Sequence, residues 1–196
     1  MSSIEEQLFA LQTGQLDHDE LFHKEITRLN IHQRLNHMAL HFAKYSGNIC
    51  NCILNSNDET VLRKNIIDSF IISITCFNTL NIRISDKLAF ENIPNISSID
   101  DLGRAISSTN KTNTEDPLWL VRSFPVIVGN LAKACESVDH LEPYAYRESI
   151  TENVVAICSL MLAAASFYKI DLITEVPSRL LGVKKKSIFF DHYVSR

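Results

Sequence analysis

Two stretches of similar pattern hold the residues best suited to bind a ligand. One reads Lys44-Tyr45-Ser46-Gly47-Asn48-Ile49, and the other reads Val126-Ile127-Val128-Gly129-Asn130-Leu131. Each lies near the end of an apolar helical segment, and a second apolar helix with Asn65 or Asn153 near its start follows. Asparagine side chains offer carbonyl oxygens to a cation and hydrogen bonds to a polar ligand, but between helices they also fix register. Both interpretations stay open from the sequence alone.

The two stretches keep a common register with their surroundings, which indicates an internal duplication. Phe42 corresponds to Phe124 at the same offset that relates the two Gly-Asn pairs. The helices that follow correspond at a slightly larger offset, with Asn65 matched to Asn153. The extra residues fall in the intervening loop, where insertions are tolerated. A repeat of this length predicts two copies of one helical unit.

Apolar residues recur with helical spacing along most of the chain, so an all-α fold is predicted. Gly14 is expected to end a first short helix, and Asp17 or Asp19 to cap the next. Pro125 is expected to kink or locally break the helix that contains it. The predicted helices cover residues 4–11, 17–30, 31–54, 59–80, 100–109, 117–138, 148–169 and 173–181.

Composition narrows the class of protein. The chain has 196 residues, 45% of them hydrophobic, and a net charge of −4, which gives no general reason to bind nucleic acid or an anionic membrane. The Lys184-Lys185-Lys186 run is interpreted as a solvated helix end.

The acidic start of the chain is unlike a secretory signal, and the longest apolar stretch, 154–168, is shorter than the ~20 residues of a membrane span. Five cysteines without a C-x-x-C pair suit a reducing compartment, so a cytoplasmic protein is expected.

The pattern resembles the MazG-like all-α nucleotide pyrophosphohydrolases. The closest echoes are Gly129-Asn130-Leu131-Ala132-Lys133-Ala134 and Tyr168-Lys169-Ile170-Asp171-Leu172. The resemblance implies two tandem four-helix units, residues 1–92 and 97–196, packed as an internal pseudo-dimer. It also implies a cleft in which four carboxylates hold Mg²⁺ against a nucleoside triphosphate, and the metal activates water.

This chain lacks most of those carboxylates. Only Asp68 is acidic among the corresponding positions of the first half, and none is acidic in the second, where Val126, Ile127 and Ala156 stand. Val126 and Ile127 are expected in the core. No catalytic residue is assigned, and Asp68 is the one metal ligand expected if there is any. The expected ligand-binding residues are Lys44, Tyr45, Asn48, Asn65, Asp68, Asn130 and Asn153.

The leading hypothesis is a catalytically degenerate MazG-like protein that binds a nucleotide-like ligand or a protein partner in a regulatory role. One alternative is an active Mg²⁺-dependent nucleoside triphosphate pyrophosphohydrolase, and another is a purely structural helical protein. No cofactor is expected unless the enzyme is active, in which case it is Mg²⁺. A homodimer is an expected assembly, and nucleic acid and membrane are not expected partners.

His37 and His41 have the spacing of a two-histidine metal site but are interpreted as polar-face residues.

Overall fold

The computed structural model describes residues 3–88, 96–109 and 116–194, and within them the chain is helical with no strand. The all-α prediction is therefore confirmed. The helices are α1 (Ile4–Phe22), α2 (Lys24–Thr27), α3 (Ile31–Asn51), α4 (Glu59–Leu80), α5 (Ile99–Thr109), α6 (Leu118–Asp139), α7 (Tyr146–Phe167), α8 (Leu172–Lys184) and α9 (Phe190–Val194), with a π-helical turn η1 (Cys52–Ser56) after α3.

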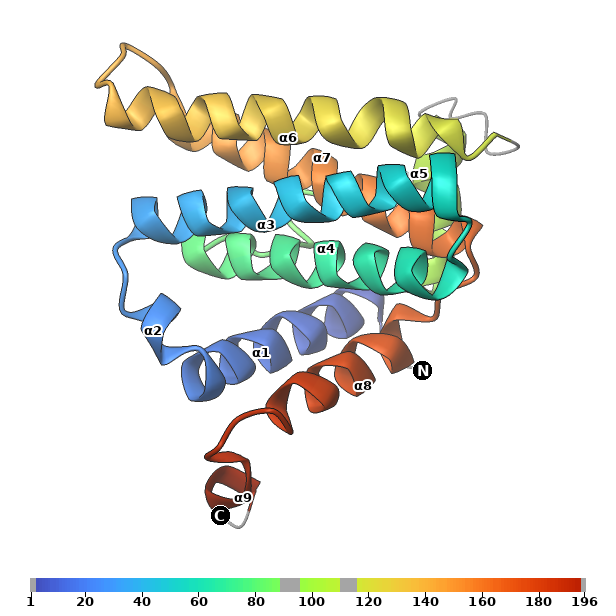
Figure 1. Cartoon of the computed structure of the whole chain (residues 1–196), viewed down its shortest axis with the longest axis horizontal. Coiled ribbons are helices and arrows are strands. Elements are labelled where there is room, and N and C mark those ends of the chain that lie inside the picture. Colours follow the sequence, from blue (N-terminus) through green and yellow to red (C-terminus); the bar gives the residue numbers. More distant parts are fainter. Residues whose placement is uncertain (1–2, 89–95, 110–115, 195–196) are drawn as a thin grey trace.

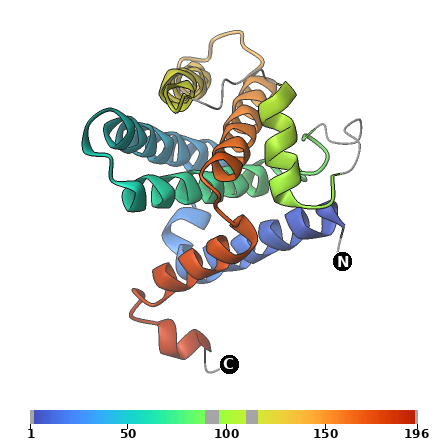
Figure 2. The same ribbon diagram turned by 90° about the vertical axis from the view of Figure 1, so that its right-hand side faces the viewer.

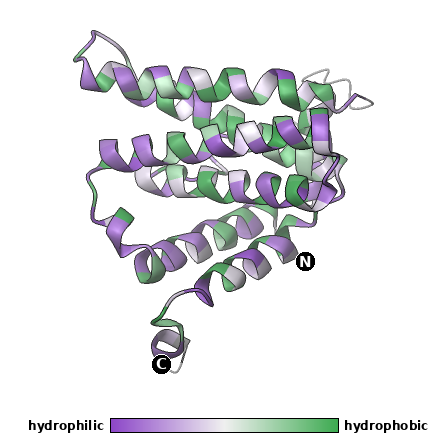
Figure 3. Cartoon of the chain, in the orientation of Figure 1, coloured by the Kyte–Doolittle hydropathy of each residue, from purple (hydrophilic) through white to green (hydrophobic). Residues whose placement is uncertain are grey.

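Four long helices form the centre of the molecule. The hairpin α3–α4 packs against the hairpin α6–α7, with α4 against α7 and α3 against α6 (Figure 1). Phe42 and Phe124, the pair matched in the sequence repeat, are fully buried and meet edge to face, with ring centroids 6.4 Å apart. Apolar and polar residues alternate along these helices (Figure 3), which is the pattern of amphipathic helices around a common core.

Three further helices flank this centre. α5 packs against α7, while α1 and α8 lie side by side against α4 (Figures 1 and 2). α4 therefore has neighbours on several sides, and this explains why most of its residues are buried. Its ends are set locally: the Asp58 carboxylate accepts a hydrogen bond from the Val61 amide, and Asn81 ends the helix with a positive φ of 54°.

The predicted break at Gly14 is wrong. α1 continues through Gly14 to Phe22, because a glycine inside a helix costs only about 1 kcal/mol. The apolar side of α1, with Leu8 and Leu11 buried, outweighs that cost. Asp17 and Asp19 do not cap a helix either, since both lie inside α1. The Asp19 carboxylate instead accepts hydrogen bonds from Gln15 and Thr75 inside the protein.

The expectation of a buried Val126 is also wrong, because this side chain is 61% exposed. α6 covers the bundle with one face only, formed by Phe124, Val128 and Leu131, and neighbouring residues on a helix point about 100° apart. Ile127 is half-buried against the core. The helix also runs through Pro125 without ending there.

By length and composition alone, α6 and α7 are long and apolar enough to cross a membrane. In the structure both belong to the four-helix centre and pack against each other. The core helix of a bundle and a membrane span share these properties, so this is weak evidence for a membrane protein.

Candidate functional site

A cavity of about 300 Å³ opens between α1, α2, α3, α4 and α8. Its walls combine buried polar groups with aliphatic side chains. The lining residues are Gln15, His18, Asp19, His23, Ile26, Thr27, Arg34, His37, Met38, His41, Tyr45, Asp68, Ile71, Ile72, Thr75, Arg179, Leu180, Val183 and Lys186. Enclosure, apolar walls and a few convergent polar groups are typical of small-molecule sites.

A second hollow, beside α5, is larger, at about 750 Å³, but more open. Four charged side chains line it. Asp100 and Arg104 form an ion pair with each other, the Asp171 carboxylate accepts hydrogen bonds from the first turn of α8, and Lys169 is the fourth. The cavity between α1 and α8 is therefore the better candidate, because it contains polar groups without partners, as described below.

Asp68, the one metal ligand that the sequence analysis allowed, is held by Arg179 across the cavity. Nε and Nη2 of Arg179 on α8 donate to Oδ1 and Oδ2 of Asp68 on α4, at 2.6 and 3.0 Å. Asp68 is only 7% exposed, and its hydrogen bond with Arg179 raises the pKa of the guanidinium. Both carboxylate oxygens thus interact with an internal cation, where the family pattern would place a metal ion.

Tyr45, another predicted site residue, is buried in the cavity wall beside this ion pair. Its hydroxyl lies 3.2 Å from Nδ1 of His41, and burial followed by the charge of Asp68 raises the pKa of the phenol, which stays protonated at neutral pH. Lys44 is exposed and its ammonium lies 4.4 Å from the centre of the Tyr45 ring. Lys44 therefore covers Tyr45 from outside and does not line the cavity.

The asparagines predicted to bind a ligand lie elsewhere. Asn48 donates to the side-chain oxygen of Asn65 at 3.1 Å, and Asn65 donates to the carbonyl of Val61. Asn130 is exposed on α6, and Asn153 donates to the carbonyl of Ser149. None of the four lines the cavity, and the Asn48–Asn65 pair joins α3 to α4. The Asn48–Asn65 contact is of the kind that the alternative interpretation expects, in which asparagines fix the register of helices, whereas the Asn153 contact lies within α7.

His37 and His41 both line the cavity, with their Nε2 atoms 3.0 Å apart. Burial, and then the charge of Lys44, lowers the pKa of His41 to about 4. His41 is therefore neutral at pH 7, and one imidazole of the pair can donate to the other. The sequence analysis interpreted both histidines as polar-face residues and did not predict that they line a cavity.

Sequence reasoning also missed the polar residues that α1 brings to the cavity. Gln15, His18 and Asp19 continue the buried stripe of Leu8 and Leu11 at helical spacing. Burial raises the pKa of the Asp19 carboxyl and, with the charges of His23 and Lys184, lowers that of His18 to about 4. Polar residues that extend an apolar helical stripe are a signal that could have identified them.

Among the described residues, four buried side-chain polar atoms have no hydrogen-bond partner, and three of them belong to residues of this cavity. These three are Oε1 of Gln15, Nδ1 of His18 and Nε of Arg34. Such groups are rare in folded proteins, because an unpaired buried donor or acceptor costs about 1–3 kcal/mol. Their concentration around one cavity indicates a polar occupant.

Comparison of the chain with protein-family models, with curated proteins and with solved structures finds no match. Function is therefore inferred from the residues of the cavity.

Proposed function

We propose that this protein binds a small anionic ligand of the nucleotide class in the cavity between α1, α3, α4 and α8, and does not hydrolyse it. The observation that carries the proposal is the group of three unpartnered buried polar atoms around one enclosed cavity. Their mixture of donors and acceptors suits a ligand that carries both kinds of group. A purely structural role gives no reason for these atoms to gather at one place.

The charges favour an anion. Within the described part of the chain, Nε of Arg34 has no hydrogen-bond partner. Lys186 adds a second cation to the wall. Of the two carboxylates there, Asp68 is neutralised by Arg179, and burial raises the pKa of Asp19, which favours its neutral form. A guanidinium on a partly buried wall is suited to phosphate or carboxylate, which it binds through two parallel hydrogen bonds.

The rest of the wall suits an apolar or planar moiety attached to the anionic group. Met38, Ile71 and Leu180 supply aliphatic surface to the same cavity as the polar residues of α1. A volume of about 300 Å³ is at the lower end of the range of small-molecule sites, which run to ~1,000 Å³. The cavity therefore fits a ligand the size of a mononucleotide better than a dinucleotide or a larger cofactor.

The ion pair of Asp68 argues against Mg²⁺-dependent hydrolysis. Mg²⁺ is held in such enzymes by carboxylates and by the phosphates of the substrate. Here the only acidic residue at the family's positions interacts with Arg179 through both oxygens, and the neighbouring positions are Lys44, Tyr45, Asn48 and Asn65. Loss of catalysis with retention of the cleft is the history we propose for this chain.

The proposal includes a duplicated pyrophosphohydrolase-like ancestor whose two units pack as a pseudo-dimer. The edge-to-face contact of Phe42 with Phe124 supports it, because matched residues meet near the axis when two copies pack symmetrically. The pairing of α3 with α6 and of α4 with α7 supports it in the same way.

Titration calorimetry with nucleoside mono-, di- and triphosphates tests the binding proposal. The wild-type protein is expected to bind at least one of them, and Arg34→Ala is expected to weaken that binding ~10-fold or more, which corresponds to about 1.4 kcal/mol. Arg122→Ala is the matched control, because Arg122 is exposed and pairs with Asp116. Absence of nucleotide binding, or an equal effect of both substitutions, contradicts the proposal.

A further inference from the structure

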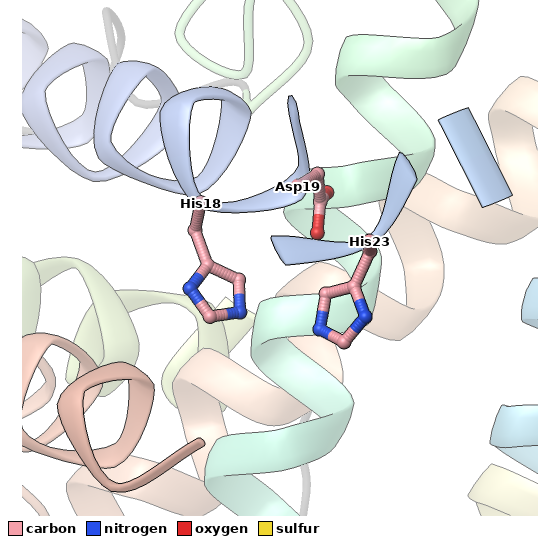
Figure 4. A group of neighbouring side chains, drawn as sticks. All are labelled: His18, Asp19 and His23. Carbon is pink, nitrogen blue, oxygen red and sulfur yellow. The ribbon is translucent and has the colours of Figure 1, made fainter. Parts of the chain in front are cut away.

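The end of α1 brings three potential metal ligands together on one side of the cavity. One ring nitrogen each from His18 and His23 and one carboxylate oxygen of Asp19 lie within 4.8 Å of one another. Figure 4 shows the two imidazoles side by side with the Asp19 carboxylate between their backbone positions. His18 and Asp19 are buried, and His23 joins α1 to α2.

Asp19 is a buried carboxylate without an ion-pair partner in the described part of the chain. It is 8% exposed, and both of its hydrogen bonds come from neutral groups: Nε2 of Gln15 to Oδ1 and Oγ1 of Thr75 to Oδ2, each at 2.9 Å. An ionised carboxylate removed from water is costly unless a cation compensates it. A bound cation next to Asp19 would supply that compensation.

The surroundings of the three residues resemble the outer shell of a metal site. Gln15 and Thr75 fix the orientation of the Asp19 carboxylate. Nδ1 of His23 lies 3.4 Å from Oε1 of Glu25, a contact that leaves the Nε2 lone pair of His23 available. Separately, His18 is only 2% exposed and its Nδ1 has no partner, so this imidazole lacks the hydrogen bonds expected of a purely structural buried histidine.

We propose that His18, Asp19 and His23 bind one divalent transition-metal ion at the end of α1. Two imidazoles and one carboxylate are a donor set that suits Zn²⁺, Co²⁺ or Fe²⁺, with the remaining positions open to water or to a ligand in the cavity. Ligand atoms on one such ion lie at ~2.0–2.2 Å from it, so they must approach to about 4 Å of one another or less. His23 can make this small movement because its side chain is 39% exposed and lies between two helices.

The donor atoms select the type of metal. Mg²⁺ and Ca²⁺ prefer oxygen ligands, and only one of the three side chains here supplies oxygen. Imidazole suits Zn²⁺, Co²⁺ and Fe²⁺, so the site is expected to prefer transition metals.

Binding of Co²⁺ and Zn²⁺ to the full chain, measured without any nucleotide, tests this inference separately from the proposed function. The wild-type protein is expected to bind one Co²⁺ with the visible absorption bands of a low-symmetry site, and Zn²⁺ is expected to displace it. His23→Ala and Asp19→Asn are expected to weaken binding ~10-fold or more. His23→Ala is the safer variant for folding, because His23 is partly exposed whereas His18 is buried.

Two control variants make the result specific. His140→Ala removes an exposed histidine that pairs with Glu136, and it is expected to leave the affinity unchanged. A double variant, His37→Ala with His41→Ala, removes the second histidine pair of the same cavity and is expected to retain the Co²⁺ spectrum. The assignment is overturned if the wild type binds neither metal, or if the His37/His41 variant loses binding while His23→Ala keeps it.

Discussion

Replacing Arg179 with alanine is expected to lower the free energy of unfolding by about 2–4 kcal/mol, because it leaves the buried Asp68 carboxylate without its cation. The expected loss is somewhat below the ~3–5 kcal/mol seen for fully buried pairs, since the Arg179 side chain is 24% exposed. Denaturant unfolding followed by circular dichroism measures the change. An Arg104→Ala variant is the matched control, because Arg104 forms its ion pairs on the exposed surface of α5, where they contribute at most about 1 kcal/mol.

A double substitution distinguishes the contribution of the ion pair from the cost of removing its two charges from water. Asp68→Leu together with Arg179→Met removes both charges, and it is expected to restore most of the stability that Arg179→Ala loses. If Arg179→Ala instead unfolds within about 0.5 kcal/mol of the wild type, the ion pair is not structural. Asp68 would then be free to bind a metal, and the argument against catalysis would fail.

Gly103→Ala is expected to destabilise the protein by about 2–3 kcal/mol, through overlap with the backbone of α7. A Cβ at Gly103 would fall inside van der Waals contact of the Leu162 carbonyl oxygen and 3.0 Å from Cβ of Ser166. The carbonyl belongs to a packed helix and cannot move aside without shifting α5 away from α7. Thermal and denaturant unfolding measure the effect.

Replacing Gly47 or Gly129 with alanine is expected to raise the free energy of unfolding instead. Both glycines lie within helices, and a Cβ there meets nothing within 4 Å. Alanine has the higher helix propensity, so each variant is expected to gain roughly 0.5–1 kcal/mol. Equal effects at Gly103 and at these two positions would show that α5 does not pack against α7 as described.

The long helices could be predicted from the sequence because their signals are local. The expected limits of α4, residues 59–80, are the observed ones, since Asp58 caps the start and Asn81 takes the left-handed conformation at the end. At α1, weak local signals led to a wrong prediction of a helix boundary. There Gly14 and Asp19 have the residue types of a helix boundary, but tertiary burial on α4 and α8 decides the outcome.

The candidate site could be predicted only in part. Tyr45 and Asp68 were expected to contact a ligand and do line the cavity. Arg179 was missed because nothing local links it to Asp68, from which it is separated by 111 residues along the chain. Pairings of this kind arise only when helices distant in sequence pack together, as α8 does against α4. The asparagines were predicted to bind a ligand from their positions in the family pattern. In the structure, Asn48 and Asn65 instead form a hydrogen bond between α3 and α4.

Release of pyrophosphate from nucleoside triphosphates, in the presence of Mg²⁺ or Mn²⁺, tests most directly the claim that this cavity binds without hydrolysis. The pure protein is expected to give no release above that of the buffer, because Asp68 is held by Arg179 and no second carboxylate stands at the matched positions. Turnover within the ~1–10³ s⁻¹ typical of enzymes, abolished by Asp68→Ala, would contradict the claim and establish an active hydrolase.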